Sequence, residues 1–108
     1  MCGIFGIVSQ KNVSEKSFKH LAKLAQQRGK DSSGLVKYFD DNYCIYRSDS
    51  SILNLIKKVK ISNSSLLLGH SRLVTNGHSD NQPVIKNEVI LLHNGIIVND
   101  EEIWNSLE

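Results

Sequence analysis

Hydrophobic residues recur along the chain with two periods, one typical of strands and one typical of helices. Residues that favour strands, together with two glycines, fill positions 2–8 and predict a short buried strand. Apolar residues three and four positions apart predict an amphipathic helix over 14–27, which Gly29 ends. A second apolar stripe predicts another helix between Ile52 and Val59.

The middle of the chain predicts a β-hairpin and a further strand. Apolar and aromatic residues at 35–39 and 43–47 flank a turn at 40–42, which consists of Asp and Asn. The Ser-Ser-Gly sequence at 32–34 is predicted as a loop that leads into this hairpin. The apolar run within 66–72 predicts an additional strand.

The last third of the chain predicts a second hairpin and a final helix. A polar loop is predicted over 75–83, and strands at 84–85 and 88–92 are expected to pair across a turn at 86–87. Asn99 is predicted to cap a helix whose first turn is acidic. The chain ends inside this amphipathic element, so we expect it to be a piece of something longer.

Composition and charge are typical of an ordinary globular domain and exclude several function classes. Of 108 residues, 40% are hydrophobic and 22% are charged, which allows one domain with a real core. A net charge of +2 is too small for the clustered basic face of a nucleic-acid-binding protein. The apolar runs fall short of the roughly 20 residues that a membrane span needs. No secretory signal is recognised, which favours the cytoplasm.

Cysteine and histidine usage argues against metal and disulfide chemistry. Cys2 and Cys44 form no CxxC motif, and a reducing compartment disfavours a disulfide between them. The four histidines lack the spacing of a ligand pair on a common face, so neither a metal site nor a cofactor is expected. Cys44 lies in the middle of a predicted strand and is interpreted as inert packing.

Cys2 has two interpretations from the residues alone. If Met1 is removed, Cys2 carries both a thiol and a free α-amine. An α-amine titrates at about 7.7–8.0 and a thiol at about 8.5, so the amine can act as general base for its own thiol. In the alternative interpretation, Cys2 is a small buried hydrophobic residue at the start of a strand.

Five sequence blocks resemble one enzyme family and favour the first interpretation. In order along the chain they are MCGIFGIV at 1–8, RGKDSSG at 28–34, GHSRLVTNG at 69–77, NQPV at 81–84 and HNGIIVN at 93–99. Together they resemble the class II glutamine amidotransferases. The resemblance implies an α/β (α+β) fold, the αββα sandwich of the N-terminal-nucleophile hydrolases. Residues 1–108 would supply the N-terminal portion of its glutaminase domain, without the synthetase domain.

The resemblance also assigns the chemistry. Cys2 would attack the side-chain amide of L-glutamine and form a γ-glutamyl thioester, which water hydrolyses to glutamate after ammonia has left. Asn94 and Gly95 match the oxyanion hole, where a side-chain amide N–H and a backbone N–H stabilise the tetrahedral intermediate. From spacing alone, Asn94-Gly95 also fits a hairpin turn.

The resemblance also implies a substrate-binding role for a second group of residues. Arg72 matches the arginine that binds the glutamine α-carboxylate, a role suited to a planar bidentate guanidinium. Thr75 matches a pocket residue, and Leu73 a position that contacts substrate through its backbone. From spacing alone, Arg72 at a strand end is equally well interpreted as a surface cation. Four further residues are interpreted as scaffold hydrogen-bonders, namely Arg28, Asp31, Ser32 and Ser33.

Departures from the family pattern leave two questions open. Leu73 follows the arginine as in asparagine synthetases, whereas RGKDSSGL resembles the sugar-aminating branch. The acceptor is therefore a sugar phosphate, phosphoribosyl diphosphate or aspartate, bound by a synthetase domain or subunit, and the resemblance is compatible with a homo-oligomer. No residue before Glu108 matches the family aspartate that binds the α-amine of glutamine. Two alternatives remain, a catalytically incomplete interaction remnant and another cysteine amidohydrolase of the N-terminal-nucleophile class.

Overall fold

A computed structural model describes residues 2–73 and 81–107 of the chain as a mixture of helices and antiparallel strands. Throughout these two ranges, no helix is long and apolar enough to cross a membrane. The elements in chain order are β1 (Gly3–Val8), α1 (Glu15–Gln26), β2 (Ser32–Phe39), β3 (Asn42–Ser48), α2 (Ile52–Lys58), β4 (Leu66–Arg72), β5 (Val84–Lys86), β6 (Val89–Leu91) and α3 (Asp100–Ser106).

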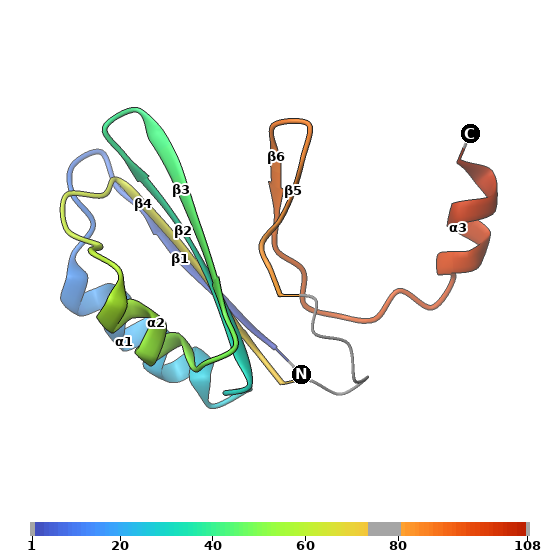
Figure 1. The fold of residues 1–108 in the computed structure, drawn as a ribbon, viewed down its shortest axis with the longest axis horizontal. Coiled ribbons are helices and arrows are strands. Elements are labelled where there is room, and N and C mark those ends of the chain that lie inside the picture. Colours follow the sequence, from blue (N-terminus) through green and yellow to red (C-terminus); the bar gives the residue numbers. More distant parts are fainter. Residues whose placement is uncertain (1, 74–80, 108) are drawn as a thin grey trace.

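Four strands form one antiparallel sheet in the order β1-β4-β2-β3, and helices α1 and α2 cover one of its faces (Figure 1). The predicted α+β class is confirmed. The prediction of a loop at 32–34 is wrong, because β2 begins at Ser32. In the register of the sheet, Ser32 lies opposite Arg72 of β4, and Gly34 lies opposite both His70 and Arg47. Pairing on both sides outweighs the turn preference of Ser-Ser-Gly.

The core lies between this sheet and the two helices. Its fully buried members include Phe18 of α1, Leu35 of β2 and Ile52 of α2. The Phe18 ring packs against Phe5 of β1 with 5.0 Å between ring centroids. Both helices begin at a serine N-cap, and Ser14 accepts a hydrogen bond from the Ser17 N–H at 3.2 Å.

Strands β5 and β6 form a separate two-stranded hairpin, and α3 lies beyond it (Figure 1). Both hairpin turns differ by one residue from the prediction. The first contains Asp40 and Asp41 but not Asn42, and the second contains Asn87 and Glu88 instead of 86–87. The two central residues of each turn have positive φ, between 48° and 65°, as expected of the tight turns that match strand twist.

Helix α3 begins at Asp100, as predicted, but the predicted side-chain cap is wrong. The side chain of Asn99 makes no capping hydrogen bond, and only its backbone carbonyl accepts a bond, from the Ile103 N–H at 3.0 Å. No residue of α3 is buried. The acidic residues of its first turn interact favourably with the helix dipole. Helix α3 has neither a side-chain cap nor buried residues to stabilise it further.

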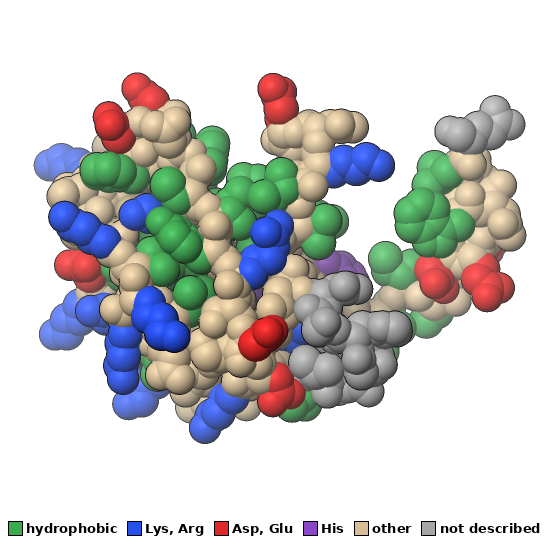
Figure 2. Space-filling view, viewed as in Figure 1, with side chains coloured by type: hydrophobic (Ala, Val, Ile, Leu, Met, Phe, Trp, Pro, Cys, Tyr) green, Lys and Arg blue, Asp and Glu red, His purple; other side chains and the backbone are tan. Residues whose placement is uncertain are grey.

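The second face of the sheet carries apolar side chains that remain partly exposed. The prediction that the first strand is buried is therefore correct for only one of its faces. Ile4 is 44% exposed and Val8 is 73% exposed, whereas Phe5 between them packs into the core. Exposed Val84, Val89 and Leu91 belong to the hairpin, and hydrophobic side chains gather between sheet and hairpin in Figure 2.

Candidate functional site

Two predicted catalytic residues, 92 positions apart in the sequence, are in direct contact. Cys2 immediately precedes β1, and Asn94 follows β6. The backbone N–H of Cys2 donates a hydrogen bond to Asn94 Oδ1 at 3.2 Å. The structure thus brings together the residue predicted to be the nucleophile and the residue predicted to stabilise the oxyanion.

A surface depression of about 530 Å³ surrounds this contact. The Cys2 thiol is free and half-buried there. Gly3 allows α1 to approach, since a Cβ at this position would lie 2.8 Å from the carbonyl oxygen of Ala25. The lining residues are Cys2, Gly3, Ile4, Phe5, Leu21, Leu24, Ala25, Arg28 and Asn94.

Arg28 is a site residue that the sequence analysis interpreted only as a scaffold group. It follows α1 and lines the same depression as Cys2 and Asn94, where it contributes a cation to a mostly apolar wall. Its backbone N–H donates a hydrogen bond to the carbonyl of Ala25 at 3.0 Å, which holds it in the turn that follows the helix. Its position at the head of the RGKDSSG block is the signal that points to it.

The predicted substrate-binding residues lie at the same end of the sheet. Gly3 of β1 pairs with Ser71 of β4, so Cys2 and Arg72 are the next residues outward on adjacent strands. The Arg72 carbonyl accepts a hydrogen bond from the Asp31 N–H at 2.9 Å, and Arg72 is half-buried. Leu73 follows with 43% exposure. Thr75 lies outside the described residues.

Residues 81–83, which we call the strap, lie against the end of the sheet that carries Arg72. A Cβ at Gly34 of β2 would collide with the carbonyl oxygen of Gln82, so the absence of a side chain at 34 permits the contact. Arg47 of β3 donates from Nε to the carbonyl of Pro83 at 2.8 Å. Pro83 is fully buried.

The strap holds the segment that carries the predicted oxyanion residues. The Gln82 side chain accepts a hydrogen bond from the His93 N–H at 2.6 Å and donates one to the His93 carbonyl at 3.0 Å. Asn94 and Gly95 follow directly. Gly95 has a φ angle of +151°, a backbone conformation that residues other than glycine rarely adopt.

His70 lies buried on β4 beside this segment. Burial lowers the pKa of His70, the His93 backbone opposes that effect, and the positive charge of Arg72 adds to it. The His70 side chain is fully inaccessible to solvent. We therefore assign it as a neutral imidazole at pH 7, one that adds no charge to the site.

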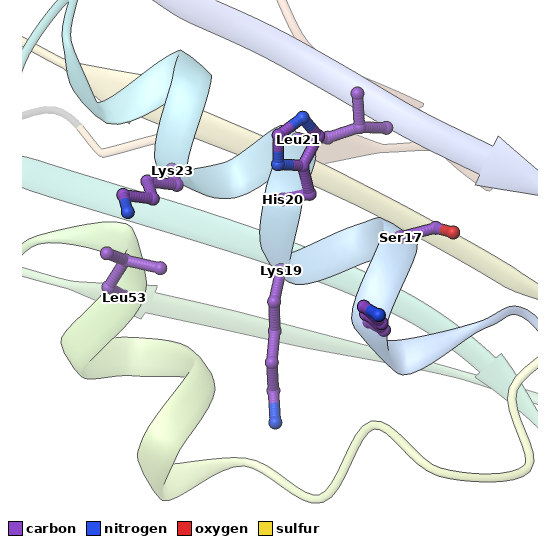
Figure 3. A pocket seen from close by; sticks show the side chains of 7 residues that line it. Ser17, Lys19, His20, Leu21, Lys23 and Leu53 are labelled. Carbon is purple, nitrogen blue, oxygen red and sulfur yellow. The ribbon is translucent and has the colours of Figure 1, made fainter.

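A second depression, of about 690 Å³, lies on the outer side of α1, where Leu53 is contributed by α2 (Figure 3). Lys19 and Lys23 of α1 extend around it. None of the predicted site residues lines it. Among the residues that the structure describes, no three His, Cys, Asp or Glu side chains lie together in a group that fits a metal ion.

The side chains that line the Cys2 depression are compatible with acyl transfer. They include a thiol (Cys2), a side-chain amide (Asn94) and a guanidinium (Arg28). Amide cleavage through a thioester uses groups of these kinds, as a nucleophile, a hydrogen-bond donor for the oxyanion and a cation for an anionic substrate.

Comparison with known proteins identifies relatives along nearly the whole chain. It is 34% identical, over 95% of its length, to a protein from Staphylococcus aureus named glutamine–fructose-6-phosphate aminotransferase (isomerizing). Proteins of the same name from Rhizobium leguminosarum bv. viciae and Bartonella quintana are 35% and 32% identical over 99% of the chain. The chain spans 18% of the length of each of these relatives. No family model matches, and no solved structure gives a significant match.

Proposed function

Because this chain is a relative of class II glutamine amidotransferases along nearly its whole length, we propose that it forms part of a glutaminase domain. It hydrolyses L-glutamine to glutamate and ammonia, and the ammonia serves an acceptor domain or subunit. The single observation that carries this proposal is the 3.2 Å contact between Cys2 N and Asn94 Oδ1. The names of the relatives favour a sugar phosphate as acceptor over phosphoribosyl diphosphate and aspartate.

The reaction begins at Cys2 after removal of Met1. The new α-amine takes the thiol proton, and Sγ attacks the side-chain amide carbon of glutamine. The carbonyl oxygen becomes an oxyanion, which the side-chain N–H of Asn94 and the backbone N–H of Gly95 stabilise. Collapse of the intermediate breaks the C–N bond and releases ammonia, which leaves with the proton from the α-ammonium. Water then hydrolyses the thioester to glutamate.

The observed orientation of Asn94 suits this role. Its carboxamide has one accepting end and one donating end. The accepting end, Oδ1, bonds to Cys2 N, so the donating Nδ2 is directed elsewhere. One contact thus holds the backbone nitrogen of the nucleophile and orients a donor for the oxyanion. Loss of one such donor typically costs about 3 kcal/mol of transition-state stabilisation.

Arg72 is proposed to bind the α-carboxylate of glutamine through its planar guanidinium. Because Cys2 and Arg72 continue adjacent paired strands, the sheet fixes the spacing between the reacting end and the anchored end of the substrate. Replacement by lysine removes the bidentate geometry, so Arg72→Lys is expected chiefly to raise the KM for glutamine. An unchanged KM would contradict the assignment. The backbone of Leu73 and the side chain of Thr75 complete the proposed substrate pocket.

The proposal is tested by intact mass and peptide mapping before and after treatment with a diazo-ketone analogue of glutamine. We expect loss of Met1 and a single adduct on Cys2. Cys44, also half-buried and free, is the internal control. In the full-length protein, Cys2→Ala is expected to abolish glutamine hydrolysis. Persisting hydrolysis, or labelling of Cys44 to the same extent as Cys2, would refute the nucleophile assignment.

A further inference from the structure

The Gln82 carboxamide makes a two-point contact with the backbone of a single residue. Oε1 accepts from the His93 N–H at 2.6 Å, and Nε2 donates to the His93 carbonyl at 3.0 Å. Both backbone groups of His93 are therefore satisfied by one side chain, as a neighbouring strand would satisfy them. The carbonyl belongs to the peptide unit that carries the N–H of Asn94, so the clamp acts on the residue immediately before the proposed oxyanion residues.

We propose that Gln82 is a positioning residue, whose side chain sets the orientation of the Asn94-Gly95 segment above Cys2. Gln82 acts through the His93 backbone and does not itself contact Cys2 or the substrate. This inference rests on the proposed glutaminase function. It assigns a role in that function to the strap, which the sequence analysis placed in a predicted polar loop and in the NQPV block without a role of its own.

The clamp is effective because Gln82 is itself held on the packed sheet. Its backbone carbonyl lies against Gly34, where any Cβ would collide with it. The next residue, Pro83, is fully buried and accepts the 2.8 Å hydrogen bond from Arg47. The Gln82 side chain thereby fixes the position of the His93 backbone relative to β2 and β3.

His70 of β4 lies on the sheet side of the same segment and is fully inaccessible to solvent. Among the described residues, neither of its ring nitrogens has a hydrogen-bond partner. The Gln82 carboxamide is therefore the side chain that is seen to hold the His93 backbone. An error of about 1 Å in the position of a catalytic donor can cost on the order of 100-fold in rate, so loss of this contact should lower kcat.

Glutamine is the side chain that satisfies both contacts. A glutamate at 82 still accepts from the His93 N–H, but its second oxygen faces the His93 carbonyl and repels it. A leucine makes neither bond. We therefore expect kcat to decrease in the order glutamine, glutamate, leucine.

The test uses the full-length protein and measures glutamine hydrolysis for Gln82→Glu and Gln82→Leu. We expect kcat to fall about 10-fold for glutamate and about 100-fold for leucine, with a KM for glutamine within a factor of about three. Alkylation of Cys2 by iodoacetamide, which needs no oxyanion donor, should proceed at the wild-type rate in both variants.

Asn81→Ala is the matched control, because Asn81 also belongs to the strap but bonds to Asp49 Oδ1 at 2.8 Å rather than to His93. Its kcat should stay within about threefold of wild type. A kcat for Gln82→Leu equal to that of wild type would overturn the inference and leave the proposed function intact. Equal losses in Asn81→Ala and Gln82→Leu, or a loss that follows a lower melting temperature, would also overturn it. A wild-type protein that neither hydrolyses glutamine nor reacts with the diazo-ketone analogue would refute the proposed function itself.

Discussion

The two described parts of the chain are held in place by different physical means. Residues 2–73 bury Phe18, Leu35 and Leu67 completely between a four-stranded sheet and two helices. Residues 81–107 leave most of their large apolar side chains 41–90% exposed, and apart from buried Pro83 they contact the first part through individual hydrogen bonds to Cys2, Arg47 and Asp49. The nucleophile belongs to the first part and the oxyanion residues to the second. The site therefore depends on packing at one side and on individual hydrogen bonds at the other.

The largest expected effect is a loss of stability in the packed part, residues 2–73. Phe18→Ala removes a fully buried ring that contacts Phe5, so the free energy of unfolding should fall by about 3–5 kcal/mol. Chemical denaturation monitored by circular dichroism measures this change. A loss under 1 kcal/mol would mean that the helices and sheet are not packed as described.

The second-largest effect is expected from a substitution that moves the strap away from the sheet and leaves the core unchanged. Gly34→Ala places a Cβ against the Gln82 carbonyl, a backbone atom that cannot rotate away, so the strap must move. We expect a loss of about 1–3 kcal/mol in stability, together with a drop of 10-fold or more in glutamine hydrolysis.

Gly6→Ala is the matched control for Gly34→Ala. Its nearest obstacle is the end of the flexible Leu68 side chain, and β1 lies at the edge of the sheet. Hydrolysis should be largely preserved in this variant. If both alanine variants lose the same activity, the strap contact is not what carries the effect.

A smaller effect concerns pH and the junction between the parts. Burial lowers the pKa of folded His70 below 6.5, so near pH 6 the unfolded chain binds more protons than the folded one. The free energy of unfolding should therefore decrease as pH falls below about 6.5, by at most about 1.4 kcal/mol per pH unit. Arg72 and His93 face the same imidazole and contribute to the shift.

This pH dependence is measured as the difference between wild type and His70→Asn over pH 7.5–5.5. The variant lacks the titrating imidazole, so its stability should vary less with pH than that of wild type. Identical slopes for the two proteins would show that the burial of His70 does not contribute.

The smallest effect is expected in the part that is not packed. Trp104 on α3 is 71% exposed, and no residue of that helix is buried. Trp104→Ala should change the free energy of unfolding of the 108-residue chain by no more than about 0.5 kcal/mol. A loss comparable with that of Phe18→Ala would show that α3 packs on the sheet or on another copy in solution.

Periodicity predicted the kinds of element along the chain, and the local errors arose where residue type alone was used. Residues 32–34 were predicted as a loop because Ser and Gly favour turns, yet Ser32 and Gly34 are paired within the sheet. The Asn99 cap was predicted from residue type, but its side chain makes no such bond. At 32–34 the outcome depends on strand partners that are distant in sequence and that a local pattern does not show. At Asn99 the backbone, with φ of −119° and ψ of 36°, lies outside the extended conformation typical of an N-cap.

The candidate site was predictable only as far as the family blocks extend. The resemblance identified Cys2 and Asn94, and the structure shows their contact. It treated Arg28 as scaffold, although Arg28 lines the same depression. The bond between Gln82 and His93 joins two separate blocks, and residue type gives no indication that one side chain bridges them.

The position of β1 at the edge of the sheet has a consequence for the order of events during synthesis. Among the described strands, the one that pairs with β1 is β4, so Gly3 can pair only after Ser71 has been synthesised. Asn94 emerges from the ribosome later still. Contacts between residues so far apart in sequence form slowly and late. The nascent chain therefore carries the cysteine while the next 92 residues are synthesised, before Asn94 exists to contact it.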